Sequence, residues 1–158
     1  MSENVSIIGL KDILRKFGLL SRKLENRALM GEVGEYVIAK IQARTQDGVD
    51  ADETPFKPYS PKYALFRTEN NRDADPVNLT WFGTMMSSMT YDADRDKVTI
   101  FFQNIDAPNP PKGEGSTPVP VKAYFLNQER RFFAMADEDV EFIGRMFRKY
   151  LNNLTRKK

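Results

Sequence analysis

The chain has 158 residues, 41% apolar and 29% charged, with a formal net charge of +2. These values are typical of one soluble domain. The absence of cysteine and of histidine excludes disulfides, thiol nucleophiles, zinc fingers and Ser-His-Asp triads. We therefore expect a binding or structural protein and not an enzyme, with no catalytic residue, metal, cofactor or small-molecule substrate.

The charge is distributed unevenly along the chain. Residues 1–27 carry a net charge of +3, residues 28–144 carry −7 and residues 145–158 carry +6. The basic tail at 153–158 favours a solvated C-terminus, although a phosphate contact with nucleic acid is an alternative. A third interpretation pairs the basic end of one subunit with the acidic middle of the next.

Two helices are predicted in the N-terminal region. Residues 9–18 place apolar side chains at helical spacing, and a second amphipathic helix is expected from Ser21, as N-cap, to about Arg44. Gly31 and Gly34 lie inside the second helix, where glycine is unfavourable. They indicate either the close approach of another element or a break in the helix.

Residues 45–78 form the first of two long Pro-rich loops. Prolines alternate with aromatics between Pro55 and Tyr63, which excludes a helix interior and a central strand there. A short helical turn is predicted at 60–67, followed by an exposed connection at 69–76. Loops of this length in compact domains are often functional.

The remainder of the chain predicts a small sheet and a final helix. One helical turn at 83–88 precedes strands at 89–91 and 98–102, joined by the Asp92–Asp96 turn, with the second strand buried on both faces. The second Pro-rich loop, at 104–122, reads as an extended arm. A strand is expected at 123–126 and a helix at 137–152, acidic in its first turn and basic in its last.

These elements predict a single α+β domain covering residues 1–158, with its core at about 9–152. The N-terminal helices and the C-terminal helix would pack on a small antiparallel sheet. Residues 1–10 lack the cationic region of a signal peptide, and no stretch approaches the roughly 20 apolar residues of a membrane helix. We expect a cytoplasmic product with no membrane partner.

Acidic clusters do not match known metal sites. Asp92, Asp94 and Asp96 alternate as in a calcium loop, but Lys97 and Gln103 occupy the places of the required glycine and glutamate. A second cluster, Asp50, Asp52 and Glu53, can supply oxygen ligands, and a metal-dependent enzyme that uses it together with Asp47 is a rival hypothesis. Solvated turns are the favoured interpretation of both clusters.

Eight residues are candidate contact residues. The first loop contributes an ordered contact or loop anchor, and Trp81 with Phe82 forms an aromatic pair that suits an interface, although core packing is the commoner fate of such a pair. Arg130 and Arg131 precede two phenylalanines, a pattern that fits a nucleic-acid patch or, preferably, buried phenylalanines with arginines facing an acidic partner. The full set is Pro55, Phe56, Pro58, Tyr59, Trp81, Phe82, Arg130 and Arg131.

The order of the motifs is more informative than any one of them. A helix ending in Ile41-Gln42-Ala43-Arg44-Thr45 is followed by Pro55-Phe56-Lys57-Pro58-Tyr59-Ser60, and then by Leu79-Thr80-Trp81-Phe82-Gly83-Thr84-Met85-Met86-Ser87-Ser88-Met89 and a hairpin. Arg130-Arg131-Phe132-Phe133 then precedes the acidic start of the last helix. Over residues 20–152 the sequence resembles the phage virion morphogenesis family, the tail-completion proteins of Mu-like tailed phages.

The resemblance implies a structural, non-enzymatic virion protein. Such a protein forms a homo-oligomeric ring at the neck or tail end, expected here as a hexamer although the sequence does not fix the subunit number. Its partners would be other copies, neck, connector or tail-tube proteins, and DNA passing through the lumen without sequence-specific binding. Its location would be the virion, after assembly in the host cytoplasm. The alternative is a nucleic-acid-binding module using the basic termini.

Two departures from the family pattern limit what the resemblance implies. Glu53 stands where many relatives have glycine, and the 104–122 stretch replaces a region that in relatives often carries a histidine and a glycine. Contacts made there are not carried over to this chain.

Overall fold

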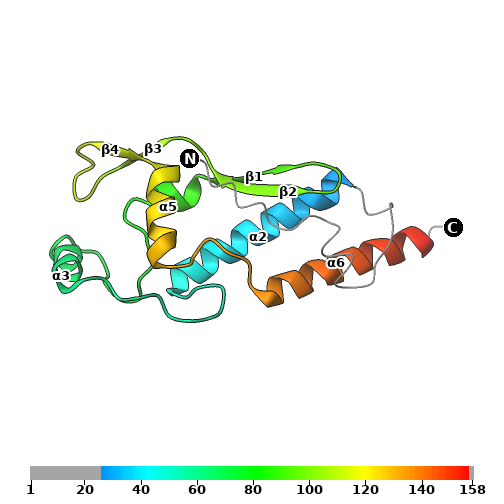
Figure 1. Ribbon diagram of the computed structural model, residues 1–158, viewed down its shortest axis with the longest axis horizontal. Helices are drawn as coiled ribbons and strands as arrows, with labels where there is room; N and C mark the ends of the chain where they lie inside the picture. The colour runs from blue at the N-terminus through cyan, green and yellow to red at the C-terminus, as the bar shows by residue number, and fades with distance from the viewer. Residues whose placement is uncertain (1–25, 157–158) are drawn as a thin grey trace.

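The computed structural model describes residues 26–156, which fold into an elongated α+β domain (Figure 1). The expected helix at 9–18 lies outside the described residues. The long helices α2, Arg27–Asp47, and α6, Asp137–Arg156, lie side by side, and a two-stranded ribbon covers α2. At the end of the molecule away from the C-terminus lie two shorter helices and a second ribbon (Figure 1). The predicted α+β class is confirmed.

Helix α2 has a clear start and stop. The side chain of Asn26 accepts hydrogen bonds from the backbone N–H groups of Ala28 and Leu29, so Asn26 is the N-cap of α2; the predicted N-cap, Ser21, lies outside the described residues. Gly48 ends the helix with φ 77°, a left-handed conformation that glycine adopts without strain. The buried stripe expected for this helix is present, and includes Val33, Val37 and Ile41.

The first ribbon packs on α2 at the two glycines. Strands β1, Met89–Ala93, and β2, Val98–Phe102, are antiparallel, with Tyr91 opposite Ile100. A Cβ atom at Gly34 would lie 2.6 Å from Cγ of Tyr91, and one at Gly31 would lie 3.4 Å from the Tyr91 hydroxyl. The glycines therefore permit close approach, as one of the two interpretations predicted, and the helix continues through them.

The two strands of the ribbon were predicted at the right positions, but the burial of the second strand differs from the prediction. Val98 and Ile100 point into the core, whereas Thr99 and Phe101 are only half-buried. Strand β2 alternates because α2 covers one of its faces, so burial on both faces was wrong. The helical turn before it, α4 at Thr84–Ser87, is confirmed.

Both Pro-rich loops contain regular structure. The first includes helix α3, Pro61–Glu69, in place of the predicted short turn. The second is not an extended arm, because β3, Asp106–Pro108, pairs with β4, Ser116–Pro118, in a second hairpin. The connection at 69–76 is mostly exposed, as expected.

The strand predicted at 123–126 is wrong. Those residues belong to helix α5, Val119–Glu129. Pro120 lies in the first turn of this helix, where its missing N–H costs no hydrogen bond. Residues 119–122, which were expected to end the second Pro-rich loop, also belong to α5, and Pro120 is better read as a marker of the helix start.

Helix α6 packs on α2 and extends further than predicted. Ile143 and Phe147 are buried against the core, and Asn26 at the start of α2 donates a hydrogen bond to the Tyr150 hydroxyl. The helix continues through residues 153–156, which were expected to belong to a basic tail. No helix in the described part of the chain is long and apolar enough to cross a membrane.

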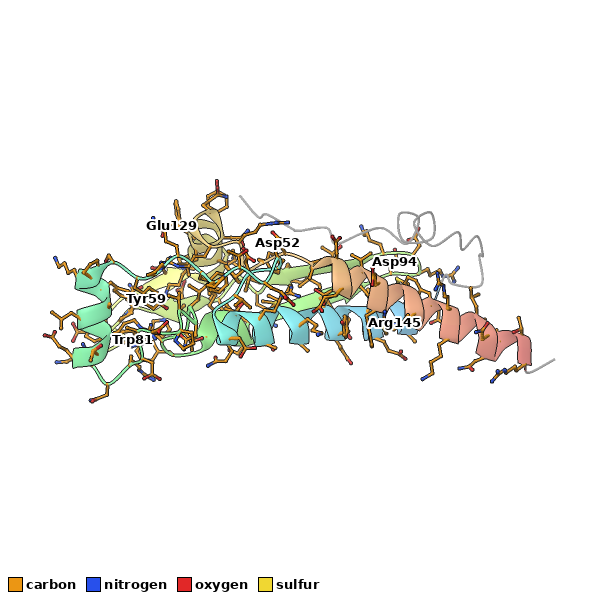
Figure 2. The ribbon with its side chains drawn as sticks, turned by 90° about the horizontal axis from the view of Figure 1, so that it is seen from below. Asp52, Tyr59, Trp81, Asp94, Glu129 and Arg145 are labelled. Carbon is orange, nitrogen blue, oxygen red and sulfur yellow. The ribbon has the colours of Figure 1, made fainter. Side chains whose placement is uncertain are left out.

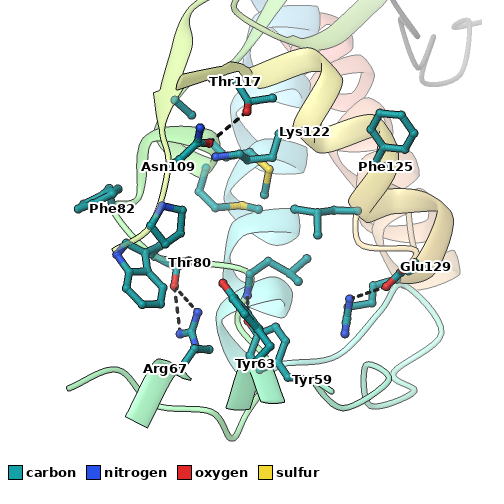
Figure 3. Close-up of a pocket in the computed structure, with 18 of the residues that line it drawn as sticks. Tyr59, Tyr63, Arg67, Thr80, Phe82, Asn109, Thr117, Lys122, Phe125 and Glu129 are labelled. Carbon is teal, nitrogen blue, oxygen red and sulfur yellow. Dashed lines mark hydrogen bonds and ion pairs between the residues drawn. The ribbon is translucent and has the colours of Figure 1, made fainter. Parts of the chain in front are cut away.

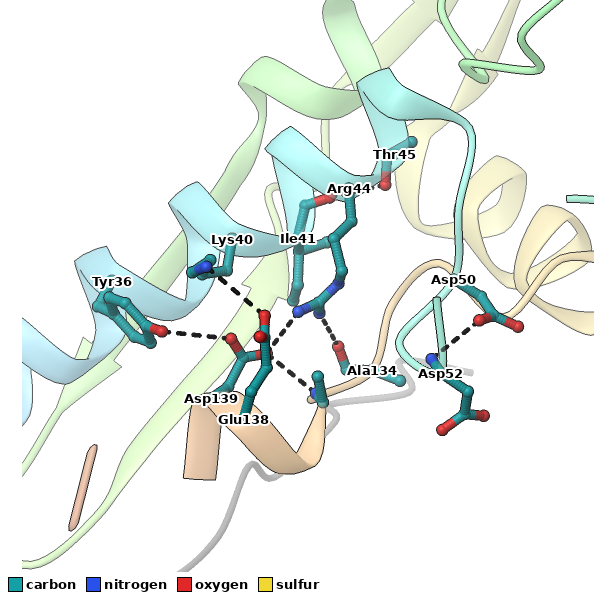
Figure 4. Close-up of polar contacts among 11 residues, drawn as sticks. Tyr36, Lys40, Ile41, Arg44, Thr45, Asp50, Asp52, Ala134, Glu138 and Asp139 are labelled. Carbon is teal, nitrogen blue, oxygen red and sulfur yellow. Dashed lines mark hydrogen bonds and ion pairs between the residues drawn. The ribbon is translucent and has the colours of Figure 1, made fainter. Parts of the chain in front are cut away.

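A buried ion pair joins α2 to the start of α6 (Figure 4). The carboxylate of Asp139, which has no exposed surface, accepts hydrogen bonds from the Arg44 guanidinium and from the backbone N–H of Ala136. Arg44 also donates to the Ala134 carbonyl at 2.8 Å. The pair fixes the angle at which α6 leaves the preceding loop.

Candidate functional site

An open apolar groove of about 970 Å³ lies at the α3 end of the molecule (Figure 3). It is enclosed by α3, the 79–86 segment, the β3–β4 hairpin and α5. Its apolar lining includes Tyr63, Trp81, Phe82, Met86, Phe125 and Leu126. We call this feature the apolar groove.

The arginine of α3 holds the first wall of the groove. Ser60 caps α3 by accepting a hydrogen bond from the backbone N–H of Tyr63. Arg67 is 2% exposed, and its guanidinium donates to the carbonyl oxygens of Asp73, at 2.6 Å, and Thr80, at 3.1 Å. These charge-assisted bonds attach α3 to the loop that leads into the 79–86 segment.

An aromatic series continues this wall. Phe66 stacks on Trp81 with ring centroids 5.4 Å apart, and Trp81 meets Phe82 edge-on. The Arg67 guanidinium lies 4.9 Å from the ring centroid of Tyr59 and 5.5 Å from that of Trp81. Such cation–π contacts strengthen when water is excluded. The wall is therefore ordered by packing and charge together (Figure 2 labels Tyr59 and Trp81 at this end).

Arg130 holds the opposite side of the groove. It is 7% exposed and donates to the backbone carbonyls of Lys57, at 2.9 Å, and Pro58, at 3.2 Å. It also pairs with Glu129 at 3.1 Å. Arg130 thus ties the end of α5 to the first Pro-rich loop.

Burial alters the pKa of two groups in the groove. It raises the pKa of the Tyr59 hydroxyl, which accepts a hydrogen bond from the backbone N–H of Leu79 at 3.2 Å. It lowers the pKa of Lys122, whose ammonium lies 3.4 Å from the Pro108 carbonyl. In both cases loss of solvent disfavours the charged form.

Five of the eight predicted contact residues line this groove. They are Pro58, Tyr59, Trp81, Phe82 and Arg130. Of these, Phe82 is 44% exposed. Residues from three separate parts of the sequence therefore meet at one site.

The other three predicted residues lie elsewhere. Phe56 is buried in the core and Pro55 forms an isolated bridge with Val49. Arg131 is exposed and pairs with Asp52 at 2.8 Å. Phe56 and Arg130 are almost fully buried, so they act as anchors within the subunit. Arg130 was predicted to face an acidic partner, but its guanidinium binds backbone carbonyls and Glu129 of its own chain. Phe132 and Phe133 are buried, as the preferred interpretation of that motif predicted, but at a junction between helices.

Sequence reasoning missed three important groove residues. Phe125 and Leu126 were assigned to a strand, although Pro120 could have indicated the helix that presents them. Arg67 was overlooked because no pattern in the sequence shows that its partners are loop carbonyls.

The acidic clusters form turns. The Asp50 carboxylate accepts hydrogen bonds from the backbone N–H groups of Asp52 and Thr54, at 2.8 and 2.9 Å, as in an Asx turn (Figure 4 shows the first). Asp94 and Asp96 lie in the exposed β1–β2 connection. Within residues 26–156, no group of three or more acidic side chains is placed to hold a metal ion.

Comparison with known proteins gives no relative: no family model, no curated protein and no solved structure matches this chain.

Proposed function

We propose that this chain is a structural, non-enzymatic subunit of a tailed-phage virion. Copies assemble head to tail into a ring at the neck or tail end, complete the tail and help it join the head. The observation that carries the proposal is the convergence of the family-like segments on the apolar groove.

The resembling segments are far apart in sequence but meet around one site. The 55–60 motif supplies Pro58 and Tyr59, the 79–89 motif supplies Trp81 and Phe82, and the 130–133 motif supplies Arg130. Motifs that shared only a fold would be expected mainly in the core. Their convergence on an open surface supports a role in contact with another protein.

The chemistry of the groove suits a protein partner. Its two arginines are committed to backbone carbonyls of the subunit itself, and Glu129 is paired with one of them. What remains accessible is chiefly apolar, with Phe125 64% exposed and Phe82 44% exposed. Contiguous exposed apolar surface rimmed by polar groups is typical of interaction sites.

The remaining partners follow from the ring. Neck, connector or tail-tube proteins would lie above and below it, and DNA would pass through its lumen without sequence-specific binding. The exposed cations Arg145, Lys149 and Arg156 on α6 are the candidates to face that DNA. The virion is then the proposed location.

The test measures the mass of the purified protein by light scattering and its shape by negative-stain imaging. We expect ring particles whose formation is reduced by Phe82→Ser, since Phe82 lies in the groove. Phe142→Ser is the matched control, because Phe142 is 38% exposed but lies on α6, stacked on Tyr36.

A strict monomer at every concentration that never joins virion particles would overturn the proposal. Monomers that bind duplex DNA with an affinity falling steeply with salt would instead favour the nucleic-acid-binding alternative.

A further inference from the structure

Helix α5 presents large exposed apolar side chains at the groove and beside it. Phe125 lines the groove and is 64% exposed, and Val121, four residues earlier on the same face of α5, is 44% exposed next to it. Phe82 reaches the groove from the facing segment (Figure 3). The walls are held by the Arg67 and Arg130 hydrogen bonds, so the site is formed before any partner arrives.

Outside the described residues, the chain contains one segment suited to such a groove. Twenty-five residues precede Asn26, and among them Leu10, Ile13, Leu14 and Phe17 follow the spacing i, i+3, i+4, i+7. This is the anchor pattern by which an amphipathic helix binds in an apolar groove. Lys11 and Arg15 fall between the anchors and would stay in solvent.

The start of α2 lies far from the groove of the same subunit. Asn26 is hydrogen-bonded to Tyr150 on α6, whereas Gln42, sixteen residues further along α2, donates to the carbonyl of Met86 in the groove lining. Sixteen helical residues span about 24 Å. Figure 1 shows α2 running from the α6 end of the molecule towards the α3 end.

The connecting residues 18–25 span at most about 28 Å when fully extended. The segment of the same chain can therefore reach the near edge of the groove only with its linker almost fully extended. A segment from a second copy has no such restriction.

We propose that residues 10–17 of one copy bind as an amphipathic helix in the apolar groove of the next copy. The inference rests on the proposed ring, because each subunit then supplies one segment and one groove. Such a contact is heterologous, and it closes into a ring when the rotation between subunits permits.

The lack of native cysteine allows a direct test by disulfide cross-linking. Leu14→Cys protein is mixed with Phe125→Cys protein and oxidised, since a disulfide forms only where the two Cα atoms approach within about 7 Å. We expect a two-chain product containing one of each variant. The matched control mixes Leu14→Cys with Asn153→Cys, an exposed position on α6, and should give none.

Absence of the Leu14–Phe125 product would overturn the inference. A cross-link found only within one chain of the double variant would also overturn it, by showing that the groove holds the subunit's own segment. Because Phe125 is exposed, its replacement should preserve the fold, which circular dichroism verifies.

A second measurement separates this inference from the proposed function. Leu14→Gln should weaken assembly by roughly tenfold or more, whereas Arg15→Gln should not. If both variants form rings as the unchanged chain does, the inference fails and the proposed function stands. If the unchanged chain forms no rings at all, the proposed function itself fails.

Discussion

The two ends of this molecule are held together by different forces. At the α6 end, α2 is covered by the β1–β2 ribbon and by α6, and side chains such as Val37, Ile100 and Ile143 have no exposed surface. At the groove end, α5 joins the core through Val119 and Ala123, whereas α3 is fixed by the hydrogen bonds of Arg67 to loop carbonyls and by aromatic contacts, and large apolar side chains stay exposed. The first end buries its large apolar side chains, whereas the second leaves several of them in contact with solvent, and under the proposed function these form the surface for a partner.

The largest expected loss of stability comes from the buried ion pair at the α6 end. Asp139→Ala leaves the Arg44 guanidinium buried without its carboxylate, so the free energy of unfolding should fall by about 3–5 kcal/mol. Denaturant unfolding followed by circular dichroism measures it. Glu138→Gln is the control, because its 3.6 Å pair with Lys40 is exposed and worth less than about 1 kcal/mol. Equal losses of unfolding free energy in the two variants would contradict the greater importance of the buried ion pair.

The glycines of α2 provide a matched pair of variants. Gly34→Ala places its Cβ atom against Tyr91 and 3.0 Å from Val98, and should destabilise the fold by about 1–3 kcal/mol. Gly31→Ala meets only ordinary contact and gains helix propensity, so it should be neutral or stabilising by up to about 1 kcal/mol. Thermal unfolding measures the stability of both variants. A Gly34→Ala protein more stable than the Gly31→Ala protein would show that the ribbon does not pack against Gly34.

A substitution at the groove end should destabilise only the elements around the groove. Arg67→Met removes the donors to the Asp73 and Thr80 carbonyls, which should cost about 1–3 kcal/mol. Hydrogen exchange should show faster exchange in α3 while α2 and α6 remain protected. Arg72→Met is the control, since Arg72 is exposed and only lies over Trp81. Loss of protection throughout the molecule would mean that the two ends are not independent.

The smallest effect concerns pH. Burial, aided by the charge of Asp139, raises the pKa of Tyr36 to about 12 from its ordinary value of 10.0. The folded state therefore keeps a proton that the unfolded state loses, and stability falls as pH rises from about 10 to 12. Tyr36→Phe cannot ionise, so its unfolding free energy should fall less over this interval. Denaturant titrations at pH 9 to 12 give the unfolding free energy of the two proteins. The same dependence on pH in both would contradict the role assigned to Tyr36.

The sequence predicted the α6 end better than the groove end, for a physical reason. Helical spacing reports which residues are buried, so α2 and α6 were identified, and the β1–β2 ribbon was identified from strand-like residues on both sides of an aspartate-rich turn. Arg67 and Arg130 instead bind backbone carbonyls of loops, and any loop offers those. The sequence therefore indicated that Tyr59 and Trp81 matter, but not that two arginines would bring them to one groove.

The error at α5 has a similar origin. Phe125 and Val121 are apolar residues on an exposed helix face, so the usual assumption that apolar means buried fails there. Under the proposed function, such a site contradicts local rules because its stabilising contacts would lie on another molecule.

The contact between Tyr91 and the two glycines has a further consequence for the alignment of the whole subunit. The aromatic ring of Tyr91 packs where α2 has no side chains, at Gly31 and Gly34. The neighbouring positions of the buried stripe, Met30 and Val37, carry large side chains. Sliding the ribbon along α2 by one turn, about 5.4 Å, would bring the ring against those side chains. Gly34 thus favours one position of the ribbon, and the ribbon's Phe102 in turn contacts Phe132 and Phe133, which precede α6.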